Sequence, residues 1–161
     1  MQLYVLDYDP ARAVQFLADV HVIKMCLETV QILSGVIVNS GGSLWDGMPR
    51  PYNPAHPVIR AIDTPSKLNW ILLYNWLLQC EFLFRFHKRH AWFDLSVSAF
   101  EKLWSPHSFA DCSGLARSFK NFSTAEPDIV LAFREYYCFK KTQIARWKYT
   151  RRREPDWLDQ K

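Results

Sequence analysis

The chain has 161 residues, of which 49% are hydrophobic and 16% aromatic. A chain of this length can form one substantial hydrophobic core. Its high content of apolar residues excludes an intrinsically disordered protein. Lysine and arginine number 20 against 16 aspartates and glutamates, a formal net charge of +4, which permits an anionic partner without requiring one.

The cysteines and the N-terminal sequence indicate in which cellular compartment the protein is expected. The four cysteines lie singly along the chain, with no Cys-x-x-Cys pair. This spacing favours reduced thiols, and we expect neither a metal nor a cofactor. The N-terminal sequence MQLYVLDYDP lacks a basic region followed by a long apolar run, so no signal peptide is expected. Polar residues interrupt the apolar runs before about 18 positions, which predicts a cytoplasmic protein with no membrane span.

The first part of the chain is predicted to be helical. Residues 2–6 read as a short extended segment, with at most a minor strand. Asp9 followed by Pro10 starts a helix, with the aspartate as N-cap. Helical periodicity then runs to about residue 38, and a break near Ala18 is compatible with it, with Asp19 capping a second helix. The pair Gly41-Gly42 ends this region.

The remaining elements are also predicted to be helices joined by loops. A Pro/Gly/Asn loop covers residues 41–57, and residues 66–89 form a long helix. Residues 96–104 form a short helix, residues 105–124 are irregular, and a last helix begins near Thr124 and runs to about Trp147. We therefore expect one compact all-α domain over residues 1–161, with four to five helices and a long Pro/Gly loop after the first long helix.

The apolar helix of the first part carries a narrow polar stripe. His21, Lys24, Glu28 and Gln31 fall within an arc of roughly 80° on a helical wheel, and Gly35 extends that arc. One interpretation is an exposed edge with an ordinary Lys24–Glu28 pair. The other is that the stripe lines an active site, since burial can shift the pKa values of these residue types toward neutrality.

The second interpretation agrees with a family resemblance. The segment LADVHVIKMCLETVQIL resembles the first long helix of the pyrimidine-dimer DNA glycosylase/AP lyase family, the phage endonuclease V type and its bacterial relatives. That helix carries a His and, seven residues later, the essential Glu, a spacing matched by His21 and Glu28. Bacterial relatives show an Asp…Lys…Glu…Gln series similar to Asp19, Lys24, Glu28 and Gln31.

A second segment carries the same resemblance. The family has an Asn/Arg-rich loop followed by His-Pro and an apolar helix that ends in a Glu and basic residues. It is similar to YNPAHPVIRAIDTPSKLNWILLYNWLLQCEFLFRFHKRH, in which His56-Pro57 is the anchor. The likeness extends to uncharacterised phage proteins with an HVxKMxLE core and a Tyr-Tyr…Trp-Lys C-terminal region. It covers roughly residues 1–90.

The resemblance implies excision of a damaged or modified base from duplex DNA, by flipping the nucleotide and breaking its glycosidic bond. It makes Glu28 the catalytic carboxylate, with His21 and Lys24 beside it. The family's nucleophile is the α-amine of a small residue at position 2, but this chain has Gln2 and is expected to keep Met1. Three alternatives remain: the Met1 amine attacks, Lys24 attacks, or Glu28 activates water with no lyase step.

Other residues are predicted to contact the substrate. Gln31, Asn53, His56 and Asn69 are candidates, although His56 can equally be a hydrogen-bonded loop residue and Asn53 can shape a turn. The C-terminal segment interleaves aromatic and basic residues, which predicts contacts to the nucleic-acid backbone or, alternatively, a solvated face. Its candidate residues are Lys140, Lys141, Arg146, Lys148, Arg151, Arg152 and Arg153.

Two other function classes fit the same sequence. The scaffold is also compatible with a non-catalytic phage factor that binds nucleic acid or protein. A third hypothesis keeps the cleft and its chemistry but takes a free nucleotide or nucleoside as substrate. In that case the basic C-terminal residues are dispensable for activity, whereas a DNA glycosylase needs them for affinity.

Overall fold

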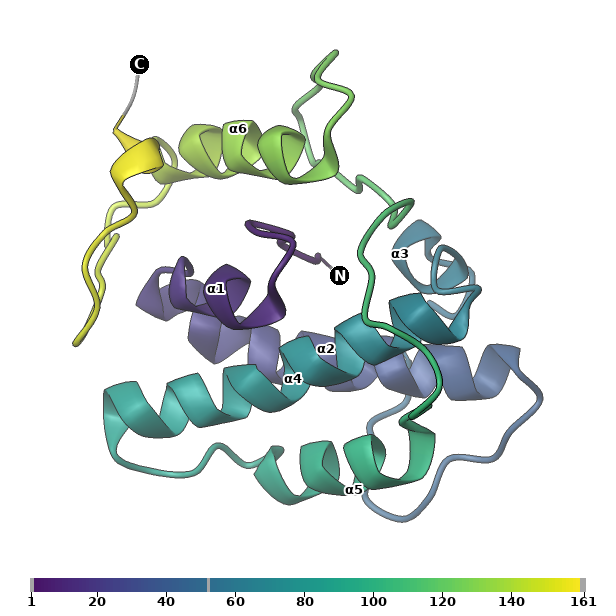
Figure 1. Ribbon diagram of the computed structural model, residues 1–161. Helices are drawn as coiled ribbons and strands as arrows, with labels where there is room; N and C mark the ends of the chain where they lie inside the picture. The colour runs from purple at the N-terminus through teal and green to yellow at the C-terminus, as the bar shows by residue number, and fades with distance from the viewer. Residues whose placement is uncertain (1, 52, 160–161) are drawn as a thin grey trace.

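Helices and loops make up the part of the chain that the structure describes (Figure 1). The structure is a computed structural model and describes residues 2–51 and 53–159. No strand is present in these ranges, which confirms the predicted all-α class. The same ranges hold six α-helices, more than the four to five expected, because two of the six are very short. They are α1 (Pro10–Gln15), α2 (Asp19–Asn39), α3 (Pro57–Arg60), α4 (Pro65–Phe86), α5 (Phe93–Leu103) and α6 (Ile129–Lys141), followed by the 3₁₀ turn η1 (Asp156–Leu158).

The first helices begin at the residues that the sequence marks, with one exception. The Asp9 carboxylate accepts a hydrogen bond of 2.8 Å from the Ala11 amide and caps α1, with Pro10 in the first turn. The break before α2 is present, but Ala18 occupies the cap position and Asp19 is the first helical residue. The predicted capping role of Asp19 is therefore wrong, and its carboxylate has other partners.

The last helix is shorter than its sequence pattern predicts. α6 begins after Asp128, whose carboxylate accepts the Leu131 amide at 2.8 Å, and it ends at Lys141. The chain beyond it turns back toward α2, where the Trp147 ring packs edge-on against His21 with 5.2 Å between ring centroids. The residues between Lys141 and Trp147 are therefore not helical, because aromatic packing of Trp147 on His21 outweighs their local helix propensity.

The N-terminal segment passes through the middle of the molecule. α4 packs against α1, α2 and α5. Figure 1 shows α6 on the opposite side of α4 from α5, with the first residues of the chain between α6 and the α2–α4 pair. Leu3, Val5 and Leu6 are fully buried there. The segment is extended, as expected, but has no strand partner among the described residues.

Close packing of α3 on α2 depends on Gly35. A Cβ atom at this position would lie 2.4 Å from Cδ1 of Ile59, well inside van der Waals contact. Because glycine has no side chain, the buried Ile59 side chain fills that space. The contact sets the position of α3, whose N-cap is His56.

α2 is the one described helix that is long and apolar enough to cross a membrane by length and composition. Its polar residues, which the sequence analysis treats as interruptions, are too few to lower its mean hydropathy below that of a span. In the structure 61% of its most apolar stretch is buried inside the protein. A central core helix has the same property, so α2 is accounted for by its packing against α4.

Candidate functional site

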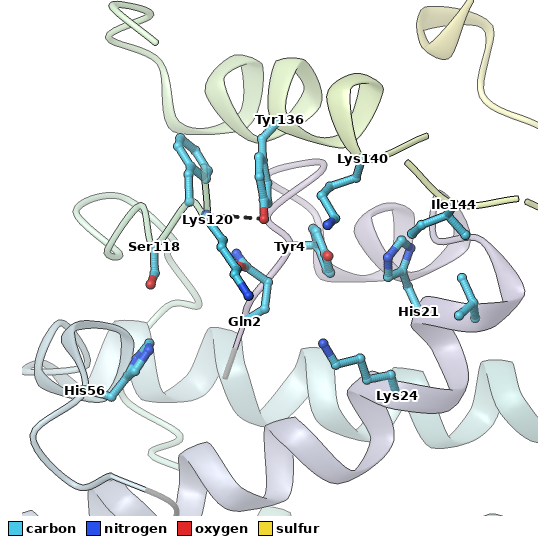
Figure 2. A pocket seen from close by; sticks show the side chains of 12 residues that line it. Gln2, Tyr4, His21, Lys24, His56, Ser118, Lys120, Tyr136, Lys140 and Ile144 are labelled. Carbon is cyan, nitrogen blue, oxygen red and sulfur yellow. Dashed lines mark hydrogen bonds between the residues drawn. The ribbon is translucent and has the colours of Figure 1, made fainter. Parts of the chain in front are cut away.

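A cleft of about 640 Å³ opens between the N-terminal segment, α2, α6 and the loop that precedes α6. Figure 2 shows side chains from all four pointing into it, with His56 of the N-cap of α3 at one end. His21 and Lys24 of the polar stripe of α2 line one wall, whereas Glu28 and Gln31 are not among the lining residues. The cleft is lined by Gln2, Tyr4, Val20, His21, Lys24, His56, Ser118, Phe119, Lys120, Tyr136, Lys140 and Ile144.

The Glu28 carboxylate is held beside this cleft by two of its lining residues. Its Oε2 accepts a hydrogen bond of 3.1 Å from the main-chain nitrogen of Gln2. Its Oε1 lies 3.3 Å from the Lys24 ammonium, and the side chain is only 13% exposed. Glu28 is therefore oriented and largely shielded from bulk water. Met1, the predicted nucleophile, lies outside the described residues.

His21 is a neutral hydrogen-bond donor in this cleft. The Tyr137 hydroxyl accepts the Ala18 amide at 2.7 Å and lies 2.8 Å from Nδ1 of His21. One lone pair of the hydroxyl accepts the Ala18 amide, and we assign the hydroxyl proton to the hydrogen bond with Nδ1, which leaves the imidazole proton on Nε2. Burial, together with the nearby charge of Lys24, lowers the pKa of His21 to about 3. The ring therefore stays uncharged at neutral pH.

Aromatic side chains form the wall of the cleft opposite α2. Phe119 stacks on Tyr136 with ring centroids 4.7 Å apart, and Tyr136 stacks in turn on Tyr4 at 6.2 Å. Burial raises the pKa of Tyr4, so its hydroxyl remains protonated. The Lys120 amide donates to the Tyr136 hydroxyl at 3.4 Å, which fixes the loop against α6. An apolar wall of this kind suits the packing of a nucleobase or a sugar.

Further cations reach the cleft from distant parts of the chain. Lys140 comes from α6, as one of the predicted basic residues, whereas Lys120 comes from the loop and was not predicted. His56 reaches it by capping α3: its Nδ1 accepts the Val58 amide at 3.3 Å. Burial lowers the pKa of His56 as well. No local pattern marks Lys120, because its position depends on contacts with α6.

Three predicted substrate contacts lie elsewhere. Asn69 is fully buried, and its amide binds the carbonyl oxygens of Ser105 and Ser108 at 2.7 and 2.8 Å. It therefore anchors a loop, and its predicted substrate role is wrong. Asn53 is exposed and accepts the Ala55 amide at 3.0 Å in a turn, the alternative that its sequence context allows. Gln31 lies on α2, half-buried, beyond the residues that line the cleft.

Most of the basic C-terminal residues are engaged within the protein. Arg152 binds both oxygens of buried Glu81 at 2.8 Å, and Arg153 pairs with Asp156 at 3.0 Å. Lys141 binds two carboxylates of the C-terminal region, and the Arg151 guanidinium donates to the carbonyl oxygen of Phe84. Lys140 lines the cleft, and Arg146, Lys148, Arg151 and Arg153 are exposed.

The partner of Arg152 belongs to a buried ionic network that ties the C-terminal segment to the helical core. Glu81 and Asp19 both bind the fully buried Arg85 guanidinium, at 2.7 and 3.0 Å. Asp19 also accepts the Thr150 hydroxyl and amide. Burial by itself raises the pKa of Glu81, but hydrogen bonds from Arg152 and Arg85 outweigh it and lower the pKa below its ordinary value. The network therefore consists of ionised groups at neutral pH.

Comparison of the chain with protein-family models, curated proteins and solved structures finds no match. The cleft and its chemistry are therefore the basis for assigning a function.

Proposed function

We propose that the protein is a DNA glycosylase that acts on a damaged or modified base. The observation that carries this proposal is the position of Glu28, a half-buried carboxylate oriented by Gln2 and Lys24 at the edge of a cationic cleft. Cleavage of an N-glycosidic bond develops positive charge on the sugar, and a fixed carboxylate stabilises that charge. The aromatic wall of the cleft suits a nucleotide removed from the base stack.

Two versions of the chemistry are compatible with this arrangement. In the first, Glu28 takes a proton from water, the water oxygen bonds to C1′, and the base leaves with the electrons of the glycosidic bond. In the second, an amine attacks C1′ and the base leaves with the electrons of the glycosidic bond; the C1′–O4′ bond then breaks, O4′ takes a proton, and a Schiff base forms.

The experiment uses purified protein on duplexes that carry a thymine dimer, an abasic site or a modified pyrimidine. We expect base release from at least one of them, and its loss in Glu28→Gln. Trapping of a protein–DNA adduct by borohydride supports the amine version, and base release without trapping supports the water version. Absence of base release and of trapping on every duplex would overturn the glycosylase proposal, and DNA binding that survives Glu28→Gln would then favour a non-catalytic binding factor.

A free nucleotide is the second candidate substrate. The observation that favours it is the engagement of Lys141, Arg152 and Arg153, three of the candidate backbone-binding cations, in intramolecular ion pairs. The double variant Arg146→Met/Lys148→Met removes two exposed cations of the C-terminal segment. If the substrate is DNA, this variant binds the duplex more weakly and with a smaller salt dependence. If the substrate is a free nucleotide, its activity matches that of the wild type.

A further inference from the structure

The polar side chains of the cleft are mainly cations and hydrogen-bond donors. Lys24, Lys120 and Lys140 enter it from α2, the loop and α6. Figure 2 shows the Lys24 and Lys140 side chains extending toward each other across the cleft, and Lys120 extending toward Gln2. No aspartate or glutamate is among the lining residues within the described ranges. The cleft is therefore electropositive and offers few acceptors.

The positive charge of these lysines is only partly compensated. Lys24 lies 3.3 Å from Glu28, and Lys140 binds the side-chain oxygen of Gln143 at 3.2 Å, which carries no charge. Lys120 has no ion pair with any residue in 2–51 or 53–159. Of the three ammonium groups only Lys24 has a carboxylate partner in the described ranges, and an anionic ligand in the cleft would compensate the charge of the other two.

Two uncharged hydrogen-bond donors line the cleft together with the three lysines. His21 has its Nδ1 engaged by Tyr137 and so keeps its proton on Nε2. Tyr4 also lines the cleft with a protonated hydroxyl. Cations and neutral donors around one space match a ligand with several acceptor oxygens and a negative charge, and phosphate has both properties. A carboxylate has fewer acceptor oxygens and would leave donors unmatched.

We propose that the cleft binds the phosphate group of a nucleotide through Lys120 and Lys140, with Lys24 opposite. The inference rests on the proposed function in one respect: the phosphate belongs to the same nucleotide whose glycosidic bond faces Glu28. Half-buried Phe119, which is backed by the buried Tyr136 ring, offers an apolar surface for its sugar and base. The phosphate is either that of a free nucleotide or one within a strand.

The test measures binding by isothermal titration calorimetry with the full chain. The probes are thymidine 5′-monophosphate, thymidine, inorganic phosphate and an oligothymidylate. We expect the monophosphate to bind at least about tenfold more tightly than thymidine, with an affinity that falls as salt rises. Tighter binding of the oligonucleotide than of the monophosphate assigns the site to a strand, and the reverse order assigns it to free nucleotides. Both orders support the phosphate site.

Matched variants locate the site. Lys120→Met/Lys140→Met is expected to weaken monophosphate binding by about tenfold or more and to leave thymidine binding unchanged. The control is Lys102→Met, which removes the same kind of charge from α5, where Lys102 packs over Trp45. A melting temperature close to that of the wild type shows that each variant is folded.

Two results would overturn the inference: equal affinity for thymidine and its monophosphate, or monophosphate affinity that survives in the double lysine variant. Neither result depends on catalysis. Glu28→Gln is expected to lose base release and to bind the monophosphate at least as tightly as the wild type, because it removes the negative charge beside Lys24. If no substrate releases a base but the lysine variants lose monophosphate binding, the glycosylase proposal fails and the phosphate site stands.

Discussion

The main-chain nitrogen of Gln2 donates a hydrogen bond to Oε2 of Glu28, a residue 26 positions further along the chain. This contact joins the N-terminal segment to α2 at the edge of the cleft. It also leaves Oε1 facing Lys24, so the two oxygens of one carboxylate have different partners. A carboxylate fixed in this way needs little reorganisation when positive charge develops near it.

Glu28→Gln tests the role of this carboxylate. Glutamine keeps an oxygen that can accept the Gln2 amide but cannot carry a charge or take a proton. We expect single-turnover base release to fall by about 100-fold or more, with little change in stability. Glu101→Gln, at an exposed position on α5, is the matched control. Base release at the wild-type rate in Glu28→Gln would remove this residue from the chemistry.

Glu81→Gln is expected to lower the free energy of unfolding by about 3 kcal/mol, because it leaves the buried Arg85 guanidinium with one carboxylate fewer. It also releases Arg152 and, with it, the C-terminal segment. Urea denaturation measures the change, with Glu101→Gln again as control. A loss below about 1 kcal/mol would show that the network contributes little to stability.

Tyr137→Phe tests the origin of the His21 tautomer. The variant removes the hydroxyl that binds Nδ1 and leaves the buried Ala18 amide without its acceptor. We expect a loss of about 1 to 3 kcal/mol in stability. Nitrogen-15 NMR of the imidazole is expected to show only the Nε2-protonated form in the wild type and a mixture in the variant. The same spectrum for both proteins would mean that another group sets the tautomer.

Stability is expected to fall as the pH decreases below 6.5. The pKa of His21 drops from its ordinary 6.5 to about 3 in the folded protein. Between these values the unfolded chain binds a proton that the folded chain does not, so His21 favours folding fully above pH 6.5 and progressively less below it. Burial also lowers the pKa values of His56 and His90, which act in the same direction.

Urea midpoints between pH 7.5 and 5 measure this dependence. His21→Gln is expected to flatten it relative to the wild type. An NMR titration of the wild type gives a direct check, since the His21 imidazole should remain neutral down to pH 5. Protonation of His21 near pH 6.5 would contradict the described burial and hydrogen bonding.

Gly35→Ala tests the contact between α2 and α3. Alanine raises helix propensity by up to about 1 kcal/mol, but its Cβ would overlap the Ile59 side chain at 2.4 Å. Overpacking outweighs propensity, and we expect a net loss of about 1 to 3 kcal/mol. Thermal unfolding measures it, with Ser34→Ala on the same helix as a comparison. Because α3 carries His56 at its N-cap, ligand binding should weaken as well.

Local signals predicted much of the fold. Capping residues, proline positions and apolar periodicity depend only on neighbours within a few residues. They predicted the Asp9-Pro10 start of α1, the break before α2 and the long α4. The end of α6 was misplaced, because Trp147 leaves the helix to pack on His21. That contact joins distant parts of the chain and has no local pattern.

The candidate site was predictable on one wall only. The spacing of His21, Lys24 and Glu28 on a helix identifies that wall, because helical periodicity fixes which side chains share a face. Lys120 enters through a loop whose path follows from packing on Tyr136. The partner of Arg152 could not be predicted for the same reason, because its counterion is Glu81, 71 positions away.

The burial of the N-terminal segment between α6 and the α2–α4 pair has a practical consequence for production of the protein. Gln2 lines the cleft, so any residues fused in front of it begin at the wall of the binding site. An affinity tag or a reporter placed there would begin at the cleft. Purification handles belong at the other terminus, beyond Asp159, whose side chain is exposed.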